Sequence, residues 1–217
     1  MAVFLSIGSG PGIGLATAER FAREGFHLVL SARDTGRVTA LAAELTAKGH
    51  KVEVRPVDVA DPAAVAALVA GVERDLGPID VLHYNAAAMR QASLADQPAE
   101  TFNTDLAVTI GGALAAAKAV APAMAARGRG TLLLTGGGFA LAPHPDYLTL
   151  SVGKAGIRAL AQGLFEEMKG KGIHVATVTI AGFVSAGSPH VANVAEHFWQ
   201  LHAQPAGSWT LERTYTP

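Results

Sequence analysis

The chain of 217 residues contains no cysteine, few aromatic residues and few charges. The absence of cysteine excludes disulfides, thiolate nucleophiles and zinc sites with cysteine ligands, and it favours the cytoplasm as the compartment. Charged residues make up 16% of the chain, the formal net charge is -1, and Lys and Arg form no run, so nothing favours binding to nucleic acid. The eight histidines show no H-E-x-x-H or comparable spacing, so we expect no metal site.

Long uninterrupted apolar segments are also missing. No stretch approaches the roughly 18 apolar residues of a membrane helix, and we expect no membrane partner. Residues 1–7 are apolar, but they lack a basic region before them and lead directly into a glycine-rich loop. We interpret them as a β-strand and not as a signal peptide.

Half of the residues are hydrophobic, and they form short runs that alternate with Ala-rich segments of helical length. This alternation is typical of βα units that build a parallel sheet. The expected strands are Val3 to Ile7, Phe26 to Ser31, Val52 to Val57, Ile79 to His83, Thr131 to Thr135, His174 to Ile180 and, near the C-terminus, Trp209 to Tyr215. Long helices are expected at Ala113 to Ala126 and Lys154 to Met168. We therefore predict an α/β fold in which residues 1–217 form a single doubly wound domain of about seven mostly parallel strands, with helices on both faces.

A glycine-rich loop follows the first expected strand and leads into a helix. It reads Gly8, Ser9, Gly10, Pro11, Gly12, Ile13, Gly14. Glycine at the strand end permits a tight turn, and glycine further along lets the backbone approach a pyrophosphate. The helix N-terminus supplies N–H groups and the positive end of a dipole. Because strand, loop and helix occur in the required order, the segment predicts binding of a dinucleotide through these residues.

The end of the second expected strand, Ser31-Ala32-Arg33, indicates the type of dinucleotide. No carboxylate stands there to bond the adenosine ribose of NAD. The planar guanidinium of Arg33 suits a 2′-phosphate, so we favour NADP(H) over NAD(H). The alternative is that Arg33 is a solvated loop residue paired with Asp34.

The glycine spacing at positions 8, 12 and 14 resembles the GxxxGxG motif of the short-chain dehydrogenase/reductase superfamily. Further segments resemble motifs of that family in the same order: Asp58-Val59, Tyr84-Asn85-Ala86-Ala87, Ser151 to Lys154, and Ala181-Gly182-Phe183-Val184. The resemblance covers residues 1 to about 185. It implies cofactor contacts from Asp58, Val59, Asn85, Ala86, Ala87, Lys154, Gly182 and Val184. It also implies a carbonyl or alcohol as small-molecule substrate, and a homodimer or homotetramer formed through the helices at 113–126 and after Lys154.

The same resemblance shows where the catalytic pattern fails. The family's tyrosine, which acts as general acid and base, stands four residues before the lysine, where this chain has Leu150. Its serine lies about thirteen residues earlier, which corresponds to Gly137. Its asparagine in the long preceding helix falls near Asp105. Losing a positioned general acid costs about 10²- to 10⁴-fold in rate.

Three interpretations of the missing acid remain open. Tyr147 lies seven residues before Lys154, about 10 Å along a helix axis, and could line the pocket or replace the acid. Asp105 and Lys154 could form a pair in which the lysine, or a water between them, moves the proton. In the simplest interpretation, Lys154 only binds ribose hydroxyls. The sequence thus supports either a variant oxidoreductase or a catalytically inactive nucleotide-binding or assembly protein.

Overall fold

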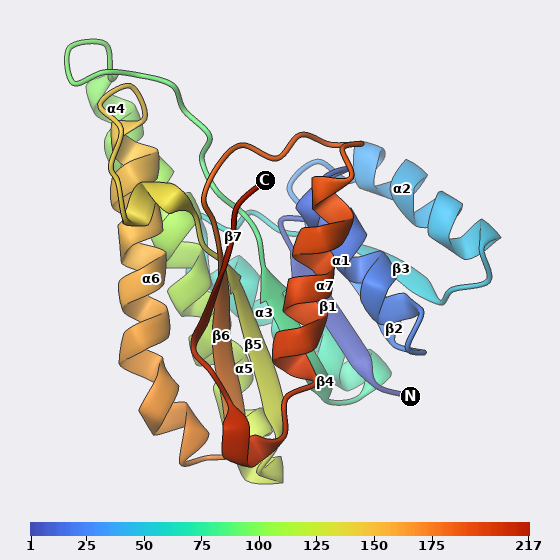
Figure 1. The fold of residues 1–217 in the computed structure, drawn as a ribbon. Helices are drawn as coiled ribbons and strands as arrows, with labels where there is room; N and C mark the ends of the chain where they lie inside the picture. Colours follow the sequence, from blue (N-terminus) through green and yellow to red (C-terminus); the bar gives the residue numbers. More distant parts are fainter.

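The computed structural model describes residues 1–217, which form a seven-stranded parallel sheet with helices on both faces (Figure 1). The strands are β1 (Val3–Ile7), β2 (His27–Ala32), β3 (Val52–Pro56), β4 (Ile79–Tyr84), β5 (Gly130–Thr135), β6 (Ile173–Ile180) and β7 (Glu212–Tyr215). Their order across the sheet is β3-β2-β1-β4-β5-β6-β7, and every neighbouring pair is parallel. The predicted doubly wound architecture is confirmed.

Helices cover the sheet in two layers. They are α1 (Ile13–Ala22), α2 (Thr35–Ala47), α3 (Pro62–Leu76), α4 (Ala99–Leu106), the π-helical turn η1 (Ala107–Gly111), α5 (Gly112–Arg127), the 3₁₀ turn η2 (Gly138–Ala140), α6 (Leu148–Lys169), α7 (His190–His202) and the 3₁₀ turn η3 (Ala206–Ser208). One core cluster joins α1, α2 and α7 to one face of the sheet, and a second joins α3, α5 and α6 to the other. Both faces are therefore buried, which explains the continuous apolar runs of the central strands.

Two elements begin more than one residue away from the start expected from the sequence. The last strand begins at Glu212 and not at Trp209, whose ring stacks flat on the His174 ring with ring centroids 4.9 Å apart. Helix α6 begins at Leu148, six residues before Lys154, and Tyr147 occupies its N-cap position. Tyr147 thus ends the loop that precedes the helix.

The longest helical segment corrects another expectation. Helices α4, η1 and α5 run on as one segment from Ala99 to Arg127, and its 29 residues are long and apolar enough, by length and composition alone, to cross a membrane. The expectation that no stretch approaches this length was wrong, because the helix expected at 113–126 continues back through η1 and α4 to Ala99. One side of α5 packs against α3 and the sheet, and 33% of the most apolar 18 residues of the segment are buried within the fold.

Gly112 allows this long helix to approach the sheet closely. A Cβ at this position would collide with the Tyr84 hydroxyl and would lie 2.7 Å from the carbonyl oxygen of Val59.

We expect Gly112→Ala to lower the free energy of unfolding by about 1–3 kcal/mol, since overpacking forces neighbours to move. Urea denaturation measures this change. The matched control is Gly163→Ala in α6, where a Cβ meets nothing within 4 Å and should stabilise the helix by about 0.5–1 kcal/mol. Equal changes in the free energy of unfolding in the two variants would contradict a close approach of the helix to the sheet at Gly112.

Candidate active site

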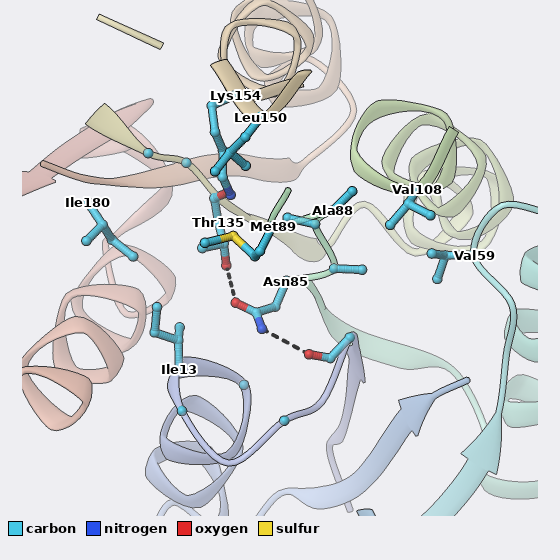
Figure 2. A pocket seen from close by; sticks show the side chains of 18 of the residues that line it. Ile13, Val59, Asn85, Ala88, Met89, Val108, Thr135, Leu150, Lys154 and Ile180 are labelled. Carbon is cyan, nitrogen blue, oxygen red and sulfur yellow. Dashed lines mark hydrogen bonds between the residues drawn. The ribbon is translucent and has the colours of Figure 1, made fainter. Parts of the chain in front are cut away.

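The carboxyl ends of the strands enclose a cavity of about 900 Å³ (Figure 2). It lies where the strand order reverses, with β2 on one side of β1 and β4 on the other, which is where open α/β sheets bind ligands. All of the predicted cofactor-binding residues line it: Gly8, Ser9, Gly10, Gly12, Ile13, Gly14, Arg33, Asp58, Val59, Asn85, Ala86, Ala87, Lys154, Gly182 and Val184. Asp105 lines it as well, whereas Tyr147 does not.

The glycine loop forms the floor of one end of the cavity. Gly8 has a φ of 87°, and a Cβ there would lie 2.6 Å from the Cα of Ala86, so the turn requires glycine. A Cβ on Gly14 would lie 3.1 Å from the Gly8 carbonyl oxygen, which shows how closely α1 approaches the strand end. No side chain caps the N-terminus of α1 at Gly12, so the N–H groups of Ile13 and Gly14 remain available to an anion, whereas the Leu15 N–H donates to the Gly10 carbonyl. This cradle fits a dinucleotide pyrophosphate.

Arg33 lies exposed at the end of β2, on the wall of the cavity. The alternative in which Arg33 pairs with Asp34 is not observed, because the Asp34 carboxylate accepts a hydrogen bond from the Gly36 N–H, 3.0 Å away, and caps α2. Asp58, after β3, accepts from the Ala60 N–H at 3.0 Å. The guanidinium of Arg33 is therefore free to meet a phosphate at this end.

Lys154 lies at the other end of the cavity and is only 8% exposed. Its Nζ donates a hydrogen bond to the carbonyl oxygen of Thr135, 2.7 Å away. Burial disfavours the charged form and lowers the pKa of the lysine from 10.5 to about 8. The cavity therefore contains an amine that changes its charge near neutral pH.

The position of this amine depends on Gly137. A Cβ on Gly137 would lie 3.2 Å from both the Cγ and the Cδ of Lys154, tighter than most such contacts. The aliphatic part of the lysine thus lies against the space that any larger residue would need. Leu150, which is 2% exposed, also lines the cavity. Gly137 and Leu150 stand where the resembled family has hydroxyl-bearing residues. Gly137 therefore offers the cavity only its backbone, and Leu150 offers an apolar side chain.

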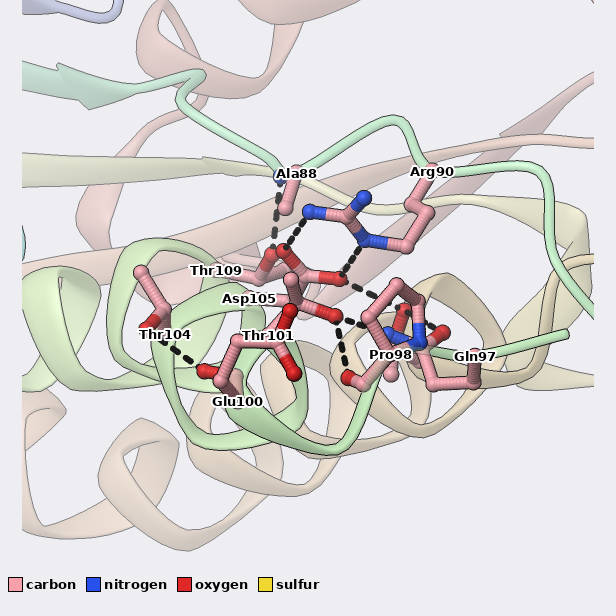
Figure 3. A network of polar contacts seen from close by, with 10 residues as sticks. Ala88, Arg90, Gln97, Pro98, Glu100, Thr101, Thr104, Asp105 and Thr109 are labelled. Carbon is pink, nitrogen blue, oxygen red and sulfur yellow. Dashed lines mark hydrogen bonds and ion pairs between the residues drawn. The ribbon is translucent and has the colours of Figure 1, made fainter. Parts of the chain in front are cut away.

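Asp105 is engaged with a different cation than predicted (Figure 3). Arg90 donates two hydrogen bonds to its carboxylate, at 2.7 and 3.1 Å, and Thr149 donates a third at 3.1 Å. The Arg90 hydrogen bond is the main reason that the pKa of Asp105 lies below its usual range. The hypothesis of an Asp105–Lys154 pair is not supported, because each side chain has another partner.

Tyr147 packs behind the rim of the cavity. Its ring stacks on Phe139 with centroids 5.3 Å apart and contacts Phe183 at 5.7 Å, and both phenylalanines line the cavity. His144 contacts two rings of this group, Phe139 and Tyr147, at 5.8 and 5.7 Å. Tyr147 thus contributes to an aromatic rim and does not stand beside Lys154.

Sequence reasoning missed several residues of the cavity. Thr135 ends β5 and touches Lys154 through its backbone, and Met89 and Arg90 extend the loop after β4. Thr109, which does not itself line the cavity, is buried within the π-helical turn η1 and accepts a hydrogen bond from the N–H of Ala88, at 3.1 Å. A polar residue at the end of an apolar strand was the only sequence signal for Thr135.

Comparison with known proteins places this fold and site in a class. A family model described as short chain dehydrogenase matches residues 2–195. Gluconate 5-dehydrogenase of Gluconobacter oxydans is 28% identical over 94% of this chain and 80% of its own length. Glycine betaine reductase ATRR of Emericella nidulans is 32% identical over 79% of this chain, which covers only 14% of that protein.

Solved structures agree with the sequence comparison. A short-chain dehydrogenase from Rhodopseudomonas palustris superposes with a TM-score of 0.91 at 28% identity, and the match covers 100% of this chain and 98% of that one. A metagenomic short-chain oxidoreductase in complex with NADP has the same TM-score at 26% identity, with 100% and 96% covered. The fold and cavity thus define a Rossmann-type nucleotide-binding oxidoreductase. The chain belongs to the short-chain dehydrogenase family.

The lowered pKa of Lys154 predicts a pH dependence of stability. Between about pH 8 and 10.5 the unfolded chain binds a proton that the folded chain has lost, so the free energy of unfolding rises with pH. Below pH 8 the lysine is protonated in both states, and its contribution is constant. Relative to Lys154→Met, the wild type should gain about 3 kcal/mol across this window. Urea denaturation at a series of pH values measures the difference between the two proteins. If the difference in the free energy of unfolding between the two proteins does not change with pH, the pKa of Lys154 is not lowered by burial.

Proposed function

We propose that the chain is an NADP(H)-dependent oxidoreductase that interconverts a small-molecule carbonyl compound and its alcohol, with Lys154 in the place of the missing tyrosine. One observation carries this proposal. A single cavity joins a glycine cradle that fits a pyrophosphate to a buried lysine amine. The first part binds a dinucleotide, and the second supplies a proton.

The residues at the cradle end determine how the dinucleotide would be held. The N–H groups at the start of α1 would face the pyrophosphate, and Arg33 would pair with a 2′-phosphate. When bound, the nicotinamide ring supplies or accepts the hydride at the carbonyl carbon. The NADP named in the metagenomic relative supports this choice of cofactor.

Lys154 carries the proton chemistry of the proposal. An ammonium group has three donors, and the Thr135 carbonyl uses one of them, so two remain for a substrate oxygen or a ribose hydroxyl. Because an efficient general acid has a pKa near the working pH, a lysine with a pKa of about 8 is suited to protonate the developing alkoxide. Leu150 beside it keeps this end of the cavity apolar, which maintains the lowered pKa.

A second candidate function is nucleotide binding without turnover. It is favoured by Gly137 and Leu150, which remove two hydroxyl groups at once. In that case Lys154 would only bind ribose hydroxyls. The expected homodimer or homotetramer, formed through α5 and α6, stays a prediction that sedimentation at micromolar concentration tests.

Cofactor binding is tested first by calorimetric titration of the purified protein with NADPH and, separately, with NADH. We expect micromolar or tighter binding of NADPH. Arg33→Ala should weaken it by about 10- to 100-fold and leave NADH unchanged, since hydrogen bonds between charged groups are worth about 1.5–3 kcal/mol. Arg129→Ala, an exposed arginine in the loop before β5, is the matched control. If neither nucleotide binds, the enzyme proposal is wrong.

Turnover is tested by following NADPH oxidation with a panel of carbonyl compounds. For a compound that is reduced, Lys154→Ala should lower kcat by about 10²- to 10⁴-fold, because the general acid is gone. The Gly137→Ser, Leu150→Tyr double variant should lose activity, because a Cβ at position 137 would lie 3.2 Å from the stem of Lys154. A gain of activity in this variant would instead favour the second candidate, a fold that has lost its catalytic hydroxyls. If Lys154→Ala leaves the measured rate unchanged, the lysine does not move the proton. Binding of NADPH with no reaction in any variant would favour the second candidate.

A further inference from the structure

A chain of buried hydrogen bonds runs beneath the glycine loop, from one face of the sheet to the cradle. His83 Nε2 lies 3.0 Å from the Thr135 hydroxyl, which donates to Asn85 Oδ1 at 2.9 Å. Asn85 Nδ2 then donates to the carbonyl oxygen of Gly8, also at 2.9 Å. Figure 2 shows the last two of these hydrogen bonds meeting at the Asn85 side chain. The chain joins β4, β5 and the end of β1 (Gly8).

The direction of each hydrogen bond is determined by its neighbours. Because the one proton of the Thr135 hydroxyl goes to Asn85, His83 must donate, and its proton is on Nε2. With Oδ1 of Asn85 accepting from Thr135, its amide N–H₂ faces the Gly8 carbonyl. A flipped amide would place two oxygens face to face at Gly8, so the chain selects one orientation of Asn85.

His83 is well suited to this role because it cannot become charged easily. Its side chain is fully buried, and its ring packs against Phe198 of α7 with centroids 4.6 Å apart. Burial, assisted by the positive charge of Lys154, lowers its pKa to about 3. The imidazole is therefore neutral at every working pH, with one N–H. Its Nδ1 has no partner, which agrees with that nitrogen bearing no proton.

Asn85 acts at the most constrained point of the cradle. Its Nδ2 would lie 3.2 Å from a Cβ on Gly14, so the amide fills the space between the strand end and the first turn of α1. The carbonyl that it holds belongs to Gly8, whose backbone geometry only glycine tolerates. If the Asn85 amide no longer held the Gly8 carbonyl, the loop could adopt other conformations, in which its N–H groups do not point toward a phosphate.

We propose that His83 and Thr135 are positioning residues for the dinucleotide: they orient the Asn85 amide, which holds the Gly8 carbonyl and thereby the phosphate-binding loop. This inference rests on the proposed function. Neither side chain needs to touch the cofactor through its polar atoms, because those atoms are used within the chain of hydrogen bonds.

The same strand offers a matched control at its other end. Thr131 lies four residues before Thr135 on the same side of β5, is 5% exposed, and bonds through its hydroxyl to Nδ1 of His202 at 2.9 Å. The Thr131–His202 pair therefore has the same residue types, similar burial and the same kind of hydrogen bond as the Thr135–His83 pair. It differs in lying far from the cavity, whose lining does not include it.

The test compares Thr135→Val, Thr135→Ser and Thr131→Val by calorimetric titration with NADPH. Thr135→Val keeps the shape but loses the hydroxyl, and it should weaken binding by roughly tenfold, because the loop is competent for only part of the time. Thr135→Ser restores the hydroxyl and should bind within about twofold of the wild type. Thr131→Val should lose stability and keep wild-type affinity. His83→Leu should resemble Thr135→Val.

A second measurement does not depend on cofactor binding. Amide hydrogen exchange of the apo protein should be faster at residues 8–14 in Thr135→Val, and unchanged there in Thr131→Val. Wild-type affinity and exchange in Thr135→Val would overturn the inference, as would equal loss of affinity in Thr131→Val. If the wild type binds neither nucleotide, the proposed function fails, and the exchange comparison still decides whether the chain positions the loop.

Discussion

The parallel pairing of β1 with β4 is the constraint on which the rest of the site depends. Its register places Ile7 opposite Tyr84, so that Gly8 and Asn85 leave the sheet side by side. The Asn85 N–H donates to the Ile7 carbonyl at 2.8 Å, and its side chain holds Gly8. Strand β1 pairs with β2 on one side and with β4 on the other. The helices that connect the strands on these two sides cover opposite faces of the sheet, and the cavity lies between them at the carboxyl end of β1.

The departures from the family pattern in the cavity are physically linked. Gly137 leaves room for the stem of Lys154, and that room lets Nζ reach the Thr135 carbonyl. Leu150 adds apolar surface beside the same amine, and this burial favours its neutral form. The absence of two hydroxyl groups thus accompanies a buried lysine whose pKa is lowered to about 8, which is why we propose that Lys154 moves the proton.

The sequence predicted those parts of the structure that are determined locally. Strand segments follow from apolar runs, and the cofactor residues follow strand ends, which must meet at one edge of a parallel sheet. The pairings of Asp105 with Arg90 and of His83 with Thr135 could not be predicted, because they join residues 15 and 52 positions apart through side-chain packing. The continuous helix at 99–127 was predicted only from 113 to 126, because its first part, α4, has few apolar residues that would mark it in the sequence.

A crystal structure of the protein with NADPH tests the central claim most directly. The account predicts the pyrophosphate over the glycine loop at residues 8–14, the 2′-phosphate within hydrogen-bond distance of Arg33, and the nicotinamide end beside Lys154. A dinucleotide bound outside this cavity, or one whose nicotinamide end points away from Lys154, would contradict it.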